Sequence, residues 1–163
     1  MFDNFPGQSQ IWIYGFSDTL SPDQKKIVIE KLDAFKSGWL YHGQPVKGDY
    51  TILYDRFAVL ITDDSISGCS IDSSVAVFKD LKSNYNIDAL NQNLIFYREH
   101  DTVKSINRPG FQKLVSEGSV RDNTIVFDLM LKSLEDLRNN KFEIEYKYSW
   151  HARAFKQPAG ISA

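Results

Sequence analysis

The segment DDSISGCSIDSSVAVF, residues 63–78, holds the only cysteine of the chain, Cys69. Apolar residues at helical spacing follow it, so we expect a helix to begin inside this segment. Unpaired backbone N–H groups at a helix N-terminus stabilise a thiolate, which makes Cys69 a candidate nucleophile or redox thiol. The same N–H groups can instead hold a phosphate or carboxylate. The residues that we expect to contact such an anion are Ser67, Gly68, Ser70, Asp72 and Ser73.

The same segment also has a purely structural interpretation. Cysteine is small and often buried, so Cys69 can simply fill a tight position in the core. Serines at the start of a helix serve as caps for its free N–H groups. If the carboxylate of Asp72 caps the helix, it fills the position that an anion would take. Packing, anion binding and thiol chemistry therefore stay open for this segment.

Two further segments, WLYHG and SWHARAF, combine histidine with tryptophan. A histidine in either segment could act as the base for a cysteine nucleophile, and an aromatic ring beside Arg can stack on a ligand or hold a phosphate. The structural alternative is that the tryptophans close the edge of the core. All three segments fall at the ends of expected elements, where loops gather into sites, so we expect them to share one cleft. The candidate residues are Trp39, His42, Trp150, His151 and Arg153.

The sequence contains no motif for nucleotide binding or for a zinc site. The chain lacks the Walker loop G-x-x-x-x-G-K-[ST] and the dinucleotide fingerprint G-x-G-x-x-G, and none of its histidines has the spacing of a zinc site. Asp63 and Asp64, with Asp72, are only a weak candidate for a divalent cation. The sequence therefore predicts no cofactor and no metal.

Composition sets the broad class. The chain has 163 residues, 42% of them hydrophobic, with a net charge of −2, which predicts one domain with a sizeable core and no nucleic-acid partner. No apolar run is long enough to span a bilayer, and the N-terminus has no secretory pattern. A single cysteine cannot form an internal disulfide, so we expect a cytoplasmic protein. Residues 1–9 are predicted to be a loose leader and residues 156–163 a mobile tail.

The elements that must position these residues can be predicted from periodicity and turn residues. A strand at 10–16 precedes a helix that Ser21 caps and Gly38 ends. A hairpin at 50–62, a second helix that begins at 70–72 and runs to about 84, and another hairpin at 93–107 follow. Pro109 opens a short helix, residues 124–140 change from strand to helix preference, and residues 141–150 form a strand or an extended arm. The order predicts an α+β fold, a ferredoxin-like split βαβ antiparallel sheet with two covering helices and a C-terminal extension.

Six of these segments also carry a resemblance to a known family. They are IWIY, F-x-x-x-W-x-x-H-G, YDRFAVLITDD, SGCSIDSSV, TIVFD and S-W-H-x-R-x-F, and together they extend over nearly the whole chain. In these segments the chain resembles a family of small uncharacterised proteins from Bacteroidota. Members are often labelled as ABC transporter ATPases. The resemblance implies no catalytic residue, and the chain differs from the pattern in its longer leader and its polar tail.

Three functions are compatible with these observations. We expect a binding or adaptor module that recognises a small anionic ligand or a partner protein at a cleft beside the SGCSIDSS loop. The first alternative is a cysteine-dependent enzyme with Cys69 as nucleophile and His42 or His151 as base. The second alternative is a structural protein whose spare aromatic residues form an oligomer interface, such as that of a homodimer.

Overall fold

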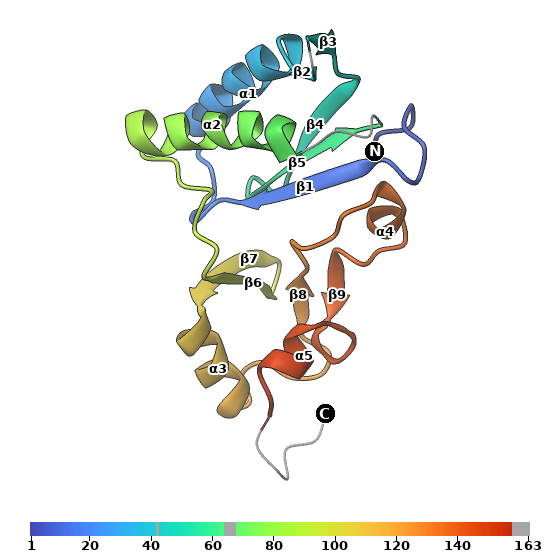
Figure 1. Ribbon diagram of the computed structural model, residues 1–163. Coiled ribbons are helices and arrows are strands. Elements are labelled where there is room, and N and C mark those ends of the chain that lie inside the picture. Colours follow the sequence, from blue (N-terminus) through green and yellow to red (C-terminus); the bar gives the residue numbers. More distant parts are fainter. Residues whose placement is uncertain (42, 64–67, 158–163) are drawn as a thin grey trace.

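The computed structural model describes residues 1–41, 43–63 and 68–157. Two antiparallel sheets lie one below the other, with two long helices on the outer face of the first sheet (Figure 1). The elements of the first half are β1 (Gln10–Gly15), α1 (Pro22–Ser37), β2 (Leu40–Tyr41), β3 (Gln44–Pro45), β4 (Gly48–Leu53), β5 (Phe57–Thr62) and α2 (Gly68–Tyr85). The elements of the second half are β6 (Leu94–Glu99), β7 (Thr102–Asn107), α3 (Arg108–Ser116), β8 (Ile125–Phe127), α4 (Leu134–Arg138), β9 (Glu143–Glu145), the 3₁₀ turn η1 (Tyr146–Tyr148) and α5 (His151–Ala154).

The first sheet has the strand order β1-β5-β4, and we call it the helix-covered sheet. Its register aligns Trp12 with Leu60 and Tyr50 with Leu60. All six residues of β5 are buried, because this central strand is covered on both faces. Strand β5 is therefore a nearly continuous apolar run rather than an alternating one.

Helix α1 begins where the capping residues predict it. The Ser21 hydroxyl accepts a hydrogen bond from the backbone N–H of Gln24 at 3.1 Å, and the Gln24 side chain accepts one from the Ser21 N–H at 2.9 Å. Pro22 follows at the first helical position. Val28 and Leu32 on the inner stripe are fully buried. The sequence prediction of this helix is confirmed.

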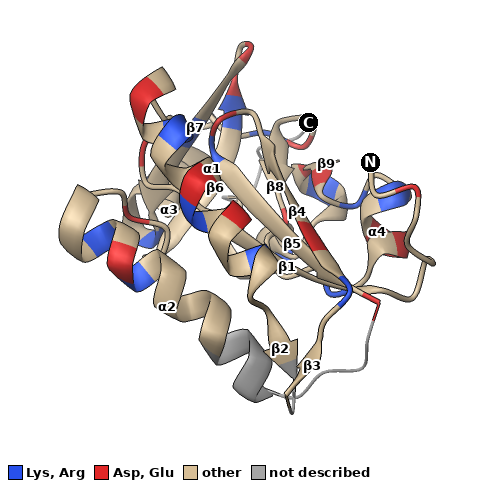
Figure 2. Cartoon of the chain, turned by 90° about the horizontal axis from the view of Figure 1, so that it is seen from above, with Lys and Arg blue, Asp and Glu red and all other residues tan. Residues whose placement is uncertain are grey.

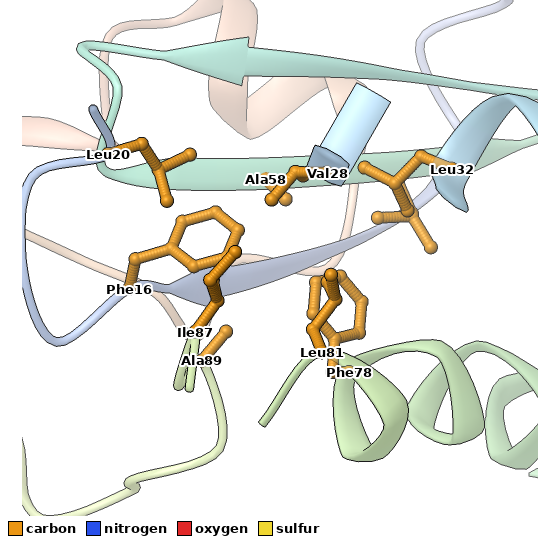
Figure 3. Packing of buried hydrophobic residues seen from close by; sticks show 10 residues of the cluster. Phe16, Leu20, Val28, Leu32, Ala58, Phe78, Leu81, Ile87 and Ala89 are labelled. Carbon is orange, nitrogen blue, oxygen red and sulfur yellow. The ribbon is translucent and has the colours of Figure 1, made fainter. Parts of the chain in front are cut away.

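The core between α1, α2 and the helix-covered sheet is built from apolar side chains (Figure 3). Phe78 of α2 packs beside Leu81 and under the ring of Tyr14, whose centroid lies 3.9 Å away. The buried members of this core are Phe16, Leu20, Val28, Leu32, Ala58, Leu60, Phe78, Leu81, Ile87 and Ala89.

The second sheet has the strand order β7-β6-β8-β9 and lies against the other face of the helix-covered sheet. Phe57 of β5 contacts Phe96 of β6, Phe127 of β8 and Phe142, with ring centroids 5.0–5.1 Å apart. This aromatic group joins the two sheets. The α+β class, the antiparallel pairing and both long hairpins are confirmed.

The pairing of β6 bears on the ferredoxin-like part of the prediction. The order β1-α1-β4-β5-α2 follows the first five elements of such a unit, if the short β2–β3 ribbon is set aside. The next strand, β6, pairs with β7 and β8 in the second sheet. The helix-covered sheet therefore has three strands. Residues 124–145, for which the sequence did not decide between strand and helix, form β8, α4 and β9.

The N-terminal segment contacts the body of the protein. Phe5 is buried in a cluster with Ile11 and Val59, and Arg138 of α4 donates hydrogen bonds to the carbonyls of Phe2 and Phe5, both at 3.0 Å. Of the predicted tail, residues 158–163 lie outside the described residues. In the part of the chain that the structure describes, no helix has the length and apolar character needed to cross a membrane.

Candidate ligand site between the two sheets

A cavity of about 370 Å³ lies between the two sheets. Its walls come from β1, from the connection between α2 and β6, from β6 itself, and from Phe127 at the end of β8 with Leu129 and Met130 after it. Gly15 lets β1 approach β6 closely, because a Cβ atom at this position would lie 2.5 Å from the Phe96 ring. Three side chains from the C-terminal half complete the lining: Arg108, Trp150 and His151.

His151 is the buried titratable group of this cavity. Its side chain is 1% exposed, and its ring stacks on Trp150 with centroids 3.9 Å apart. Burial, and secondarily the charge of Arg108, lower the pKa of His151 to about 4. The imidazole is therefore neutral at pH 7. Its Nδ1 lies 3.1 Å from the hydroxyl oxygen of Ser149.

Arg108 supplies a positive charge at the edge of the cavity. It is the first residue of α3, and its guanidinium lies over the rings of Trp150 and Phe155, at 5.7 and 5.8 Å from their centroids. Within the described part of the chain, no carboxylate forms an ion pair with it. The guanidinium is thus held by aromatic rings while its N–H donors stay available to a ligand.

Trp150 lines the cavity, and its indole N–H interacts with the carboxylate of Asp128. The indole Nε1 of Trp150 is buried and has no hydrogen-bond partner of normal geometry among the described residues. Burial raises the pKa of Asp128, while the backbone N–H of Met130, at 2.9 Å, and the indole N–H of Trp150 act in the opposite direction. Asp128 itself is not part of the cavity lining.

The structure brings together two of the predicted site residues, Trp150 and His151, as lining of this cavity. Arg153, two residues further on, is exposed and does not line it. Trp39 lies elsewhere, in an aromatic cluster with Phe35 and Trp12 on the helix side of the helix-covered sheet.

The predicted loop is described only in part. Helix α2 begins at Gly68, two residues before the predicted start at 70–72, and Ser73 is exposed on it. His42 and Ser67 lie outside the described residues, as do the side chains of Cys69, Ser70 and Asp72. A shared cleft for the three segments, and the reactivity of Cys69, therefore stay predictions.

One contact connects α2 with the cavity wall. Tyr14 lines the cavity, and its hydroxyl lies 3.0 Å from that of Ser74, one helical turn beyond Ser70. The same tyrosine stacks on Phe78 of α2. The helix that carries the predicted loop thus packs against β1 on the side of the helix core, and β1 separates it from the cavity.

Sequence reasoning missed Arg108, Asn91 and Gln92. Arg108 stands before Pro109 in a segment that reads only as a helix start, with Asn107 as its cap. Asn91 and Gln92 belong to a connection between elements, where polar residues are ordinary. Their convergence on the cavity depends on how the two sheets pack, which no local spacing indicates.

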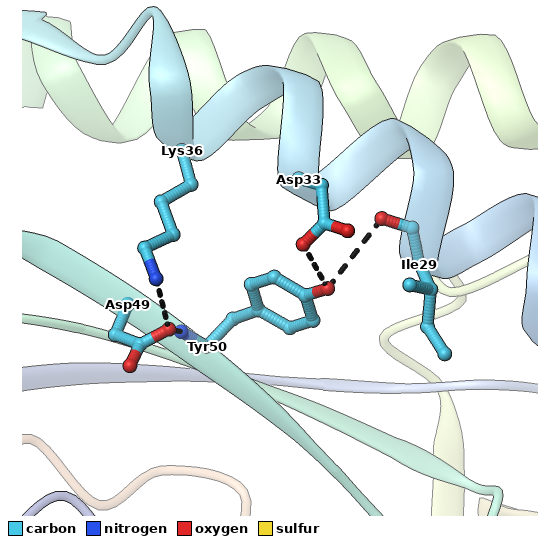
Figure 4. Close-up of polar contacts among 5 residues, drawn as sticks. All are labelled: Ile29, Asp33, Lys36, Asp49 and Tyr50. Atoms are coloured by element: carbon cyan, nitrogen blue, oxygen red, sulfur yellow. Dashed lines mark hydrogen bonds and ion pairs between the residues drawn. The ribbon is translucent and has the colours of Figure 1, made fainter.

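A second cluster of polar residues connects α1 with the edge strand β4 of the helix-covered sheet (Figure 4). The Tyr50 hydroxyl donates to Asp33 at 2.6 Å, and the Lys36 ammonium donates to Asp49 at 3.0 Å. Burial, and then Asp33, raise the pKa of Tyr50. These contacts fasten α1 to β4, and we assign them a structural role.

Among the described residues, no three His, Cys, Asp or Glu side chains gather closely enough to hold a metal ion. The comparisons with known proteins add no assignment of this chain to a family: no protein-family model, no curated protein and no solved structure matches it.

Proposed function

We propose that this protein is a binding module for a small organic anion, and that the ligand lies in the cavity between the two sheets. The observation that carries the proposal is Arg108, a guanidinium without a carboxylate partner among the described residues, at the edge of a cavity with aromatic walls. Ligand sites commonly combine an apolar cavity of this size with a few fixed polar groups.

The charge distribution indicates that a single cation, rather than the overall charge of the protein, attracts the anion. Lys and Arg are interspersed with Asp and Glu in Figure 2, and neither sign forms a continuous field in that view. The net charge is −2. An anion must therefore be recognised by a particular cation, and Arg108 can bind a carboxylate or phosphate with two parallel hydrogen bonds.

The cavity walls favour a ligand with an apolar body. Phe96, Phe127 and Trp150 supply rings, and the amides of Asn91 and Gln92 supply polar contacts at one side. Residues of this kind bind flat or aromatic groups through stacking and burial. The ligand that fits this lining has one anionic group at Arg108 and an apolar portion between the sheets.

We also propose the predictions from the sequence about the SGCSIDSS loop, the ferredoxin-like fold and the family. The contact of Tyr14 with Ser74 supports a link between the cavity and the helix that bears the SGCSIDSS loop. The ferredoxin-like description is supported by the order of the first five elements, and the resemblance to the Bacteroidota family by the quoted motifs. A role for Cys69 as nucleophile and an oligomer interface stay alternative predictions.

Calorimetric titration with indole-3-acetate, an aromatic carboxylate small enough for the cavity, tests the proposal. We expect binding at millimolar concentration or tighter, and we expect Arg108→Gln to weaken it about tenfold. Arg153→Gln makes the same charge change at an exposed position outside the cavity, and it should leave the dissociation constant unchanged. Absence of binding, or equal weakening by both variants, would contradict the proposal.

A further inference from the structure

The hydrogen bonds around Ser149 determine which nitrogen of His151 carries the proton. The Ser149 hydroxyl donates its single hydrogen to the backbone carbonyl of Tyr146 at 2.8 Å. Because a hydroxyl has only one hydrogen to donate, the Ser149 oxygen can only accept a hydrogen bond from the imidazole. Nδ1 of His151, 3.1 Å from it, is therefore the protonated nitrogen, and Nε2 is the unprotonated one.

The surroundings hold this arrangement in place. The His151 ring is stacked on Trp150 and lies 5.9 Å from the ring of Phe111, measured between centroids. The low pKa of His151 keeps the ring neutral at pH 7, so Nε2 retains its lone pair. Nε2 forms no hydrogen bond with any residue that the structure describes.

We propose that Nε2 of His151 is a fixed hydrogen-bond acceptor of the cavity, which therefore selects organic acids that also carry a hydroxyl or N–H donor. This inference rests on the proposed function and sharpens it. The anionic group of the ligand lies at Arg108, its apolar body lies between the sheets, and its donor faces His151. A ligand without the donor would cover this acceptor and leave it unpaired, which costs affinity.

A matched pair of probes tests the selection. Indole-3-acetate and naphthalene-1-acetate share a carboxylate and a bicyclic aromatic body, but only the indole has an N–H donor. We expect the wild-type protein to bind indole-3-acetate about tenfold more tightly. His151→Phe keeps an aromatic ring without the acceptor, and it should reduce the ratio of the two dissociation constants to about one. His151→Gln keeps an acceptor near the position of Nε2 and should restore part of the preference.

The outcomes separate this inference from the proposed function. If neither probe binds, the proposed function is wrong. If both probes bind through Arg108 with equal dissociation constants, the cavity binds anions but the selection by His151 is wrong. Long-range ¹H–¹⁵N correlation spectra of the wild-type protein provide a test that no folding defect can obscure. We expect a protonated Nδ1 and an unprotonated Nε2, and the opposite tautomer would overturn the inference.

Discussion

The two faces of the helix-covered sheet are packed in different ways. The face toward α1 and α2 is closed by apolar side chains such as Leu32, Phe78 and Leu81, all fully buried. The face toward the second sheet contains aromatic rings, the buried guanidinium of Arg56 and the cavity. A closed apolar layer supplies stability, whereas a layer with polar groups and space can also recognise a ligand.

Two arginines on this side of the helix-covered sheet also differ, since Arg56 is buried and Arg108 is exposed. Arg56 is buried, and its guanidinium donates to the carbonyls of Phe16, Ser17 and Val103 and to the hydroxyl of Ser105. It connects the hairpin of the first sheet to β7 of the second. Arg108 has no such set of acceptors among the described residues. The first cation is therefore structural, and the second is available to a ligand.

The largest effect is expected from Arg56→Leu. The carbonyls of Phe16 and Val103 would lose the guanidinium donor, and the Ser17 carbonyl would keep only its bond from the Ser105 hydroxyl. This loss should lower the free energy of unfolding by about 3–5 kcal/mol. Chemical denaturation measures this change, and hydrogen exchange should show that the second sheet loses more protection than α1. Lys25→Gln, which removes a half-exposed ion pair with Asp55, is the control and should cost less than about 1 kcal/mol. An equal cost for both variants would refute the structural role of Arg56.

The next effect is the dependence of stability on pH. The pKa of His151 is about 4 in the folded protein and about 6.5 when unfolded, so the unfolded state binds the proton more tightly. Stability is complete above pH 6.5 and falls by up to about 3 kcal/mol as the pH decreases toward 4. The measurement is the free energy of unfolding against pH for wild type and His151→Phe. The difference between the two proteins should shrink over this range, and a constant difference would exclude a buried neutral histidine.

A smaller effect is expected from Gly15→Ala. The new Cβ would meet the Phe96 ring at 2.5 Å and Leu129 at 2.9 Å, so the walls of the cavity must move apart. We expect a loss of about 1–3 kcal/mol in stability, together with weaker binding of indole-3-acetate. Gly7→Ala is the matched control, since its Cβ would lie at an ordinary 3.6 Å from Glu135. Unchanged stability and binding in Gly15→Ala would show that the sheets are not close-packed here.

The smallest effect concerns the helix-covered layer. Ser21→Ala removes the cap of α1 and should cost about 1 kcal/mol without changing ligand binding. Ser83→Ala, an exposed position on α2, should be nearly neutral. If Ser21→Ala weakened binding of the organic acid as strongly as Arg108→Gln does, the separation between a stabilising layer and a binding layer would fail.

The sequence predicts the local elements well because their signals are local. The cap at Ser21, the apolar stripe through Val28 and Leu32, and the alternation in the hairpins each depend on neighbours a few residues away. The second sheet was less predictable, because β6 lies between β7 and β8 only after a long connection through α3 returns the chain. The sequence also indicated Trp150 and His151 as site residues. It could not indicate Arg108, because its role arises from the packing of α3 against α5.

Chemical-shift mapping with indole-3-acetate on uniformly ¹⁵N-labelled protein tests the central claim most directly. If the ligand lies between the two sheets, the largest shifts will fall on the backbone of Gly15 and Asn91 and on the indole N–H of Trp150. The amides of Val28 and Leu32, inside the closed helix layer, will serve as internal references and stay unchanged. Shifts confined to Ser73 and the first turns of α2 would place the ligand at the serine-rich loop and contradict the assignment to the cavity.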